Sequence, residues 1–367
     1  AAAGACSAAA SLLDAGVAWH AQDKYEVTAG EEALFGGHQD MFDELVKQAC
    51  AAERRERSTR GDEPAAKRHC TGQSLPYLQQ RLRYEDGKLL DAFGRGVMMG
   101  WEAPLMERHA ELLQPAGADV LNVGFGLGLV DGSLQKHRPR SHAIVEAHPD
   151  VLEEVRRQGW YERPGVTVHP GQWQDIVHQL PAASFDAIFY DTYEETYVDL
   201  RKFLAHAPRL LRPGGRLSFF NGMAPYNIFY HAVYCRMAQE DLLDLGLTCD
   251  YCAMEIGDLG DSTWQGVAQR YWSFRTYYLP LAKIGAQQCS DKAAEGVCAK
   301  DVAQLSDCAS WRRWPSNAVR VGDAVGPGVE VSSEYWSSPP TSEDEGSKEL
   351  DAIFDSVLEG EDGINET

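Results

Sequence analysis

Strand-like and helical runs alternate between residues 75 and 280, and this alternation constrains the fold more than any other feature. It is typical of a mostly parallel sheet with helices on both faces. The predicted strands are Asp119–Val123, His142–Glu146, Val166–His169, Phe185–Tyr190, Arg216–Phe220 and a last one over Arg270–Tyr278. The predicted helices between them include Pro149–Gln158 and Tyr197–Leu211. We therefore expect an α/β fold.

The first of these strands runs directly into a glycine-rich loop, VGFGLGL, over residues 123–129. Glycine permits a tight turn and lets the backbone approach a ligand closely. The next strand ends in an acid, Glu146, and Rossmann-like folds use an acid about 20 residues after the glycines to bind the hydroxyls of a ribose. Together the loop and the acid favour nucleoside binding over a purely structural turn.

Two nucleoside cofactors suit such a loop, NAD and S-adenosylmethionine. The glycines 124, 126 and 128 stand at steps of two rather than in Gly-x-Gly-x-x-Gly spacing, and no helix N-terminus is marked for a pyrophosphate. S-adenosylmethionine has no phosphates. The strand that ends at Asp191, followed by LLRPGG (210–215) and a further strand, has the order of class I S-adenosylmethionine-dependent methyltransferases, which the chain resembles.

One carboxylate stands in unusually apolar surroundings. In GVMMGWEAPLM (96–106) Glu102 is the only charged residue, and buried carboxylates need a cation or hydrogen-bond donors as partners. From the residues alone two explanations stay open, a carboxylate that satisfies backbone donors at a helix start or one that binds a cationic ligand. Asp191, at the end of its strand, is likewise either an active-site acid or a turn cap.

Further segments in the same order extend the resemblance to one family. They are VMMGWEAPLM (97–106), LNVGFGLGLVD (121–131), IVEAHP (144–149), GQWQD (171–175), FYDTYEE (189–195), LLRPGG (210–215) and FFNG (219–222). Together they resemble the protein arginine N-methyltransferase 2 family, whose relative guanidinoacetate N-methyltransferase has the same architecture. The resemblance covers roughly residues 75–280.

The resemblance implies a set of site residues. Glu102 and Asp191 would bind a guanidinium, a planar cation that stays protonated at any ordinary pH, one gripping it and the other accepting its proton. Asn221 would help to hold the substrate, although a simple turn explains Asn221-Gly222 equally well. The implied cofactor site comprises Tyr84, Met98, Gly124, Phe125, Gly126, Leu127, Gly128, Leu129, Glu146, Ala147, His148, Gln172, Trp173 and Asp191.

The resemblance also implies an activity, methyl transfer from S-adenosylmethionine to the delta nitrogen of an arginine in a protein, by family a ribosomal one, in cytoplasm and nucleus. Two alternatives remain, a small-molecule guanidino methyltransferase and a non-catalytic interaction module. Intact Gly124, Glu146, Glu102 and Asp191 argue against the module. Deleting residues 1–60 should impair protein methylation more than guanidinoacetate turnover.

Outside this region the chain divides by composition. Residues 1–50 contain a 33-residue offset between Leu12-Leu13 and Leu45-Val46 and resemble an ankyrin repeat; a plain helical hairpin is the alternative. We predict a charged linker over 51–74, a methyltransferase domain over 75–282, and a mostly disordered tail over 283–367 that ends in an acidic segment. Apolar residues at helical spacing in 350–358 suit either a partner's groove or a transient helix.

Net charge and cysteines exclude some function classes. A formal charge of −21 argues against a nucleic-acid partner, and no apolar run approaches membrane-spanning length. The N-terminal residues lack a basic segment and a Met, so we expect no signal peptide and an incomplete or processed N-terminus. Cys249 and Cys252 form the one close cysteine pair, and we expect reduced cysteines and no metal site.

Overall fold

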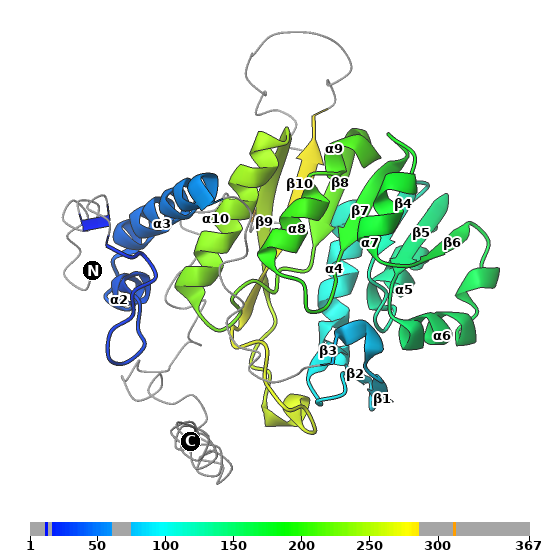
Figure 1. Cartoon of the computed structure of the whole chain (residues 1–367), viewed down its shortest axis with the longest axis horizontal. Coiled ribbons are helices and arrows are strands. Elements are labelled where there is room, and N and C mark those ends of the chain that lie inside the picture. Colours follow the sequence, from blue (N-terminus) through cyan, green and yellow to red (C-terminus); the bar gives the residue numbers. More distant parts are fainter. Residues whose placement is uncertain (1–11, 14–16, 61–74, 286–310, 313–367) are drawn as a thin grey trace, which may run out of the picture.

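The computed structural model describes residues 12–13, 17–60, 75–285 and 311–312. Its centre is an eight-stranded sheet of order β11-β9-β10-β8-β7-β4-β5-β6, with helices against both faces (Figure 1). The strands are β4 (Asp119–Val123), β5 (Ser141–Glu146), β6 (Val166–Pro170), β7 (Phe185–Tyr190), β8 (Leu211–Phe219), β9 (Leu247–Glu255), β10 (Thr276–Ile284) and β11 (Trp311–Arg312). The expected α/β fold is confirmed.

The five strands from β6 to β8 run parallel, and the register places their carboxyl ends together. Val123 of β4 pairs with Val145 of β5 on one side and with Tyr190 of β7 on the other. The residues that follow these strands, among them Gly124 and Asp191, therefore meet at one edge of the sheet. Strands β8, β10, β9 and β11 are joined antiparallel.

The helices between the strands follow the alternation in the sequence. They are α4 (Ala103–Leu113), α5 (Leu129–Lys136), α6 (Pro149–Arg157), α7 (Trp173–Ile176), α8 (Tyr197–Leu204), α9 (Ala207–Leu210) and α10 (Ile228–Asp244). Short 3-10 helices are η1 (Tyr77–Gln79), η2 (Gly100–Glu102), η3 (Trp160–Glu162), η4 (Val177–Gln179) and η5 (Asp261–Trp264).

Central strand residues are fully buried, which explains why these strands are continuous apolar runs in the sequence. Leu121, Ile144 and Ile188 are each 0% exposed. The strands predicted as Asp119–Val123 and Phe185–Tyr190 have those bounds in the structure.

Three predicted elements differ from the structure. The helix expected over Tyr197–Leu211 ends at Leu204, because Pro208 cannot continue it and lies instead in the first turn of α9. Strand β8 starts at Leu211, so it includes the Pro-Gly-Gly segment expected to precede it. The last strand is Thr276–Ile284 rather than Arg270–Tyr278, because the bulky residues 270–274 form a loop instead. Strand β9 had no counterpart among the predictions.

A small antiparallel sheet precedes the main one and positions Glu102. It consists of β1 (Arg83–Glu85), β2 (Lys88–Leu90) and β3 (Gly96–Met99). The chain then turns through η2 into α4, with Pro104 in the first turn of that helix, where proline is tolerated. Glu102 therefore lies at the junction of η2 and α4.

The N-terminal helices form a hairpin of α2 (Ala29–Phe35) and α3 (Gln39–Arg60) that packs against α10 (Figure 1). Thr28 caps α2, accepting a hydrogen bond from the backbone N–H of Glu31 at 3.2 Å. The predicted linker boundary at residue 50 is wrong, because α3 continues to Arg60 and its last turns form ion pairs with α10. The resemblance of this hairpin to an ankyrin repeat stays a prediction.

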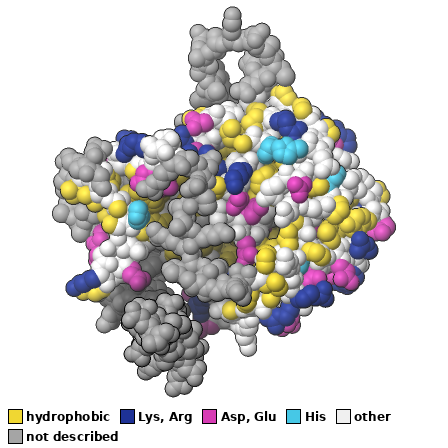
Figure 2. Space-filling view, in the orientation of Figure 1, with side chains coloured by type: hydrophobic (Ala, Val, Ile, Leu, Met, Phe, Trp, Pro, Cys, Tyr) yellow, Lys and Arg dark blue, Asp and Glu magenta, His cyan; other side chains and the backbone are white. Residues whose placement is uncertain are grey.

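Strand β10 extends two residues beyond the predicted domain end at 282. Of the tail predicted to be disordered, the structure describes residues 283–285 and 311–312. The rest of the tail, including residues 350–358, lies outside the described residues, as do residues 61–74 of the predicted linker. No described helix is long and apolar enough to cross a membrane. On the face shown in Figure 2, Lys and Arg side chains of the described residues are interspersed with Asp and Glu.

Candidate active site

The glycine-rich loop between β4 and α5 depends on backbone conformations that favour glycine. Gly124 has φ +92° and Gly126 has φ +55°. A Cβ atom at Gly124 would lie 1.7 Å from the backbone oxygen of Asp191, and one at Gly126 would lie 2.8 Å from Sδ of Met98. The loop therefore lies directly against the end of β7 and against β3.

Glu146 is held by backbone N–H groups from two sides. The N–H of Phe125 donates to Oε2 at 2.8 Å, and those of Ala147 and His148 donate to Oε1 at 2.7 Å each. The side chain is 8% exposed, and burial raises its pKa despite these donors. The carboxylate is thus fixed in orientation beside the glycine loop.

A first cavity of about 440 Å³ opens at this edge of the sheet. Among its lining residues, Tyr77, Gln174, Thr192, Tyr193 and Glu195 were not predicted. None of the described residues that line it is Lys, Arg or His, whereas three are acids. The predicted cofactor residues that line it are Met98, Gly124, Gly126, Glu146, Ala147, Gln172, Trp173 and Asp191.

Other predicted cofactor residues do not line this cavity. Phe125 is fully buried, and its ring centroid lies 5.4 Å from that of Trp160. Its side chain therefore packs in the core beneath the glycine-rich loop rather than lining the cavity. His148 is buried, and its ring centroid lies 4.7 Å from that of Tyr77. Of these two residues, Tyr77 lines the cavity. Tyr84 is 38% exposed on β1. Leu127, Gly128 and Leu129 lie in the turn into α5 and also outside the lining.

A second cavity of about 450 Å³ adjoins the first. Both cavities are lined by Val97, Asp191, Thr192, Tyr193 and Glu195. The second also contains Glu102, and its described lining again includes no Lys, Arg or His. Its six tyrosines are Tyr190, Tyr193, Tyr197, Tyr226, Tyr234 and Tyr271. An acidic and aromatic lining of this kind suits a cation.

Glu102 is 3% exposed, and its two oxygens differ. Oε1 accepts the backbone N–H of Met99 at 2.7 Å and the hydroxyl of Tyr271 at 2.5 Å. No described residue donates to Oε2. Burial, with repulsion from Asp191 added, raises the pKa of Glu102 to about 8. One oxygen is therefore anchored by the protein and the other is available to a ligand.

Asp191 follows β7 at the carboxyl edge of the sheet. Its backbone N–H donates to the Val123 oxygen at 2.9 Å, which holds it beside the glycine loop. No described residue donates a hydrogen bond to its carboxylate, and burial raises its pKa to about 7. Asp191 lines both cavities, and the second cavity brings it together with Glu102.

Asn221 does not line the second cavity, and its prediction as a substrate residue needs correction. It is 0% exposed, and its amide donates to the Tyr278 oxygen at 2.8 Å. Its backbone N–H donates to the hydroxyl of Tyr277 at 2.6 Å. The neighbours Phe220 and Gly222 line the cavity instead, because Asn221 points from the end of β8 into the protein.

Glu195 organises the loop between the two cavities, although the sequence did not single it out. Its carboxylate accepts hydrogen bonds from four side chains. The donors are Trp173 Nε1 at 2.8 Å, Gln174 Nε2 at 2.9 Å, Thr192 Oγ1 at 2.5 Å and the Tyr190 hydroxyl. Glu195 thereby joins the cofactor-side wall to the loop that carries Asp191. Acids are common in loops, so its position in TYEET offered no signal.

The cysteine pair is not a metal site. Cys249 and Cys252 lie three residues apart on β9, so their side chains point to opposite faces of the sheet. Both are buried as free thiols. Within the described residues, no group of three or more His, Cys, Asp or Glu side chains could hold a metal ion.

The sequence of this chain is similar to one described protein family and to several curated relatives. The family described as guanidinoacetate N-methyltransferase matches residues 78–242. That span contains Glu102, Glu146 and Asp191. Similarity to solved structures is weak: a spermidine synthase from Thermotoga maritima is 14% identical with a TM-score of 0.42, over 68% of this chain and 81% of that one. A similarity at that level supports no argument about function.

Curated relatives are much more similar. Protein arginine N-methyltransferase 2 of Aspergillus oryzae is 44% identical over 56% of this chain, but the match spans only 51% of that protein. The chain thus spans about half the length of this relative. Protein arginine N-methyltransferase 2 of Cryptococcus neoformans is 35% identical over 74% of this chain and 81% of its own length. The chain belongs to the protein arginine N-methyltransferase 2 family.

Proposed function

We propose that this chain transfers a methyl group from S-adenosylmethionine to a guanidino nitrogen of an arginine in a protein substrate. The observation that carries the proposal is the joint exposure of Glu102 and Asp191 to one acidic, aromatic cavity that adjoins the cavity beside the glycine loop. The names of the relatives support methylation of arginine in proteins.

The first cavity fits S-adenosylmethionine better than a phosphate-bearing cofactor. Its described lining offers acids and no basic side chain, which disfavours a pyrophosphate and suits a sulfonium cation. Glu146 would accept the ribose hydroxyls, Trp173 would lie beside the adenine, and Gly124 and Gly126 would allow close backbone approach. When bound, the cofactor supplies an electrophilic methyl group and remains as S-adenosylhomocysteine.

Glu102 and Asp191 would bind the guanidinium as a pair. Oε2 of Glu102 and the carboxylate of Asp191 have no described donor, so both can accept N–H groups of the substrate. A guanidinium would also relieve the repulsion between the two carboxylates, which lowers their pKa values on binding. Both buried carboxylates, Glu102 and Asp191, would therefore favour binding of the guanidinium.

The nitrogen that accepts the methyl group must lose one proton. We assign proton acceptance to Asp191, because it lines both cavities and so lies where substrate and cofactor meet. Glu102 would grip and orient the guanidinium, since Tyr271 and Met99 fix its other oxygen. Orientation localises the nitrogen lone pair, and proton transfer by a positioned carboxylate contributes about 10²–10⁴-fold in rate.

Finer parts of the proposal rest on the family resemblance alone. They are methylation at the delta nitrogen, a ribosomal protein as the substrate, and a location in cytoplasm and nucleus. The residues that line the second cavity are compatible with any guanidino nitrogen, because carboxylates accept N–H groups from each of them.

A second candidate is methylation of a small guanidino compound. The match of residues 78–242 to the guanidinoacetate N-methyltransferase family favours it, since this span contains both cavities' acids. The shared chemistry of the site explains why both substrates are plausible on physical grounds.

The test is incubation of the purified chain with labelled S-adenosylmethionine and either cell-extract protein or guanidinoacetate. We expect label in protein, and fragmentation of modified peptides should locate it on an arginine nitrogen. Glu102→Gln should lose at least about 100-fold of this activity, since it removes the charge but keeps an oxygen for Met99 and Tyr271. Glu107→Gln, on the exposed face of α4, is the matched control.

The outcomes separate the candidates. Label in guanidinoacetate but not in protein would favour the small-molecule activity. Label in neither, with S-adenosylmethionine bound, would contradict both. Equal loss in Glu102→Gln and Glu107→Gln would remove the assigned role of Glu102.

A further inference from the structure

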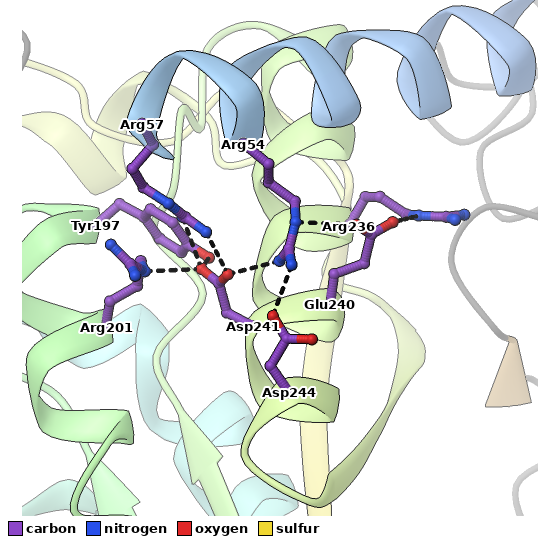
Figure 3. Close-up of polar contacts among 8 residues, drawn as sticks. All are labelled: Arg54, Arg57, Tyr197, Arg201, Arg236, Glu240, Asp241 and Asp244. Atoms are coloured by element: carbon purple, nitrogen blue, oxygen red, sulfur yellow. Dashed lines mark hydrogen bonds and ion pairs between the residues drawn. The ribbon is translucent and has the colours of Figure 1, made fainter. Parts of the chain in front are cut away.

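A buried carboxylate on α10 joins three helices that are distant in sequence. Asp241 is 7% exposed and accepts hydrogen bonds or ion pairs from four side chains (Figure 3). Its partners are Arg54 at 2.7 Å, Arg57 at 2.6 and 2.9 Å, Arg201 at 2.9 Å and the hydroxyl of Tyr197 at 2.7 Å. Helix α3 supplies two of these partners and α8 the other two.

The charges around Asp241 tie the N-terminal hairpin to the rest of the molecule. Arg54 also reaches Asp244 at 2.6 Å and Glu240 at 3.4 Å, both on α10. Figure 3 shows Arg54 and Arg57 extending from α3 toward Asp241, with Tyr197 and Arg201 approaching from the left of the view. Removing the partners of a buried carboxylate strongly destabilises the folded protein. The stability of the interface between α3 and α10 therefore depends on all of these contacts together.

One of these partners belongs to the wall of the second cavity. Tyr197 and Leu200 of α8 line it, and α8 begins directly after the loop that carries Asp191 and Glu195. The hydroxyl of Tyr197 binds Asp241, while its ring lies 5.5 Å from that of Tyr234, another lining residue. Asp241 therefore sets the position of a ring that faces the substrate cavity.

The same hairpin also contacts the start of α10, which follows a further segment of the cavity lining. Residues 222–226 line the cavity, and Asn227 directly after them caps α10 and hydrogen-bonds with Glu31 of α2. A Cβ at Gly30 would lie 2.0 Å from the ring of Phe229, so α2 and α10 are in the closest contact there. The hairpin thus packs against the start of α10, directly after these lining residues, as well as at Asp241.

We propose that Asp241 is a positioning residue for substrate binding, which with Arg54 and Arg57 of the N-terminal hairpin holds Tyr197 in the wall of the guanidino cavity. The proposal rests on the proposed function and deepens it. The hairpin then supports the substrate site through these contacts, and its loss weakens binding of any guanidino substrate.

The experiment compares three variants of the full chain. Tyr197→Phe keeps the ring and removes the hydrogen bond to Asp241, and Asp241→Asn removes the charge. Asp244→Asn is the matched control, because it removes an ion pair of Arg54 at the same interface without contacting Tyr197. The measurements are KM and kcat for an arginine peptide and for guanidinoacetate, the Kd of S-adenosylmethionine, and Tm.

We expect KM for the methylated substrate to rise about fivefold in Tyr197→Phe and about tenfold or more in Asp241→Asn, the scale of the net contribution of one hydrogen bond. The kcat and the cofactor Kd should stay within about twofold, because the first cavity is not lined by these residues. Asp244→Asn should change KM by less than about twofold. A purely structural role would move Tm in all variants and KM in none.

A double-mutant cycle sharpens the test. Arg57→Gln and Tyr197→Phe act through the same carboxylate, so their effects on KM should be clearly non-additive. Additive effects, a KM in Tyr197→Phe equal to that of Asp244→Asn, or a cofactor Kd that shifts as much as KM would each overturn the inference. If Asp241→Asn does not fold, the Tyr197→Phe comparison still decides. If the wild-type chain methylates neither substrate, the proposed function itself fails and the inference fails with it.

Discussion

At the scale of single residues, the two oxygens of Glu102 have different surroundings. Two donors, the backbone N–H of Met99 and the hydroxyl of Tyr271, fix Oε1 and with it the orientation of the carboxylate. No described residue donates a hydrogen bond to Oε2. Asp191 has an unsatisfied carboxylate in the same cavity. Burial disfavours the charged form of each carboxylate and therefore raises the pKa of both. Without a cation, two charged carboxylates beside one cavity are unfavourable. The site is therefore prepared for a positive ligand.

The first residue-scale prediction concerns Asp191→Asn. The amide keeps the shape of the side chain but cannot accept the proton, so turnover should fall by about 10³-fold or more. The Kd of S-adenosylmethionine, measured by calorimetry, should change by no more than a few-fold. Asp186→Asn, at the other end of β7 where it pairs with Arg212, is the control and should stay active. Joint loss of turnover and cofactor binding would instead indicate a folding role for Asp191.

The second concerns pH. The pKa of Asp191 is about 7 and that of Glu102 about 8 in the free protein, whereas the guanidinium stays protonated far above pH 8. Raised carboxyl pKa values mean that the charged pair is lost as pH falls, so kcat/KM for an arginine peptide should rise through pH 7–8 and then level off. Glu102→Gln should remove the upper part of the rise. A flat profile between pH 6 and 9 would contradict this.

At the scale of elements, the turn from β4 into α5 packs against the segment that follows β7. Gly124 brings the loop within contact of the Asp191 backbone, so the glycine loop and the loop after β7 are packed together. The helix after the loop contains Gly132, for which an added Cβ would meet open space. These two glycines therefore respond to substitution in opposite ways.

Gly124→Ala should destabilise the protein by at least about 2 kcal/mol, since it combines a strained positive φ with a backbone clash. It should also abolish binding of S-adenosylmethionine. Gly132→Ala should raise stability by up to about 1 kcal/mol through helix propensity and leave cofactor binding intact. Urea unfolding and calorimetry would measure both. A Gly124→Ala protein that binds the cofactor normally would show that the loop can move away from Asp191.

At the scale of the whole molecule, the contacts of the N-terminal hairpin alter the result expected from deleting residues 1–60. Removing residues 1–60 was expected to separate protein methylation from guanidinoacetate turnover. The deletion also removes Arg54 and Arg57 and leaves Asp241 with fewer partners. Both activities should then decline, so point variants at this interface discriminate better than the truncation.

Net charge supplies a prediction at the same scale. A chain of formal charge −21 with acidic cavities should attract basic peptides, and such long-range attraction is screened by salt. The kcat/KM for an arginine peptide with lysine flanks should fall several-fold between about 0.05 and 0.5 M NaCl. A peptide with neutral flanks is the control and should respond less. Equal responses would exclude electrostatic steering of the substrate.

Much of the fold and part of the site were predictable from sequence because their signals are local. Strands β4 and β7, the glycine loop and the acids Glu146 and Asp191 lie in short apolar or glycine-rich runs whose pattern reflects burial on both faces. Helix α3 and the boundary of β10 were not, because charged residues 51–60 and bulky residues 270–275 are ambiguous without knowledge of what they pack against.

By itself the sequence indicated the alternation of strands and helices, although not β9, together with the glycine-rich loop and the two candidate acids. Only the tertiary structure decided which distant side chains contact these acids and Asp241. Tyr271 binds Glu102 across 169 residues and Arg57 binds Asp241 across 184, and Asn221 turned inward rather than to the cavity. Local patterns encode burial and turns, whereas contacts between distant side chains depend on how the packed elements converge, and no short segment contains that information.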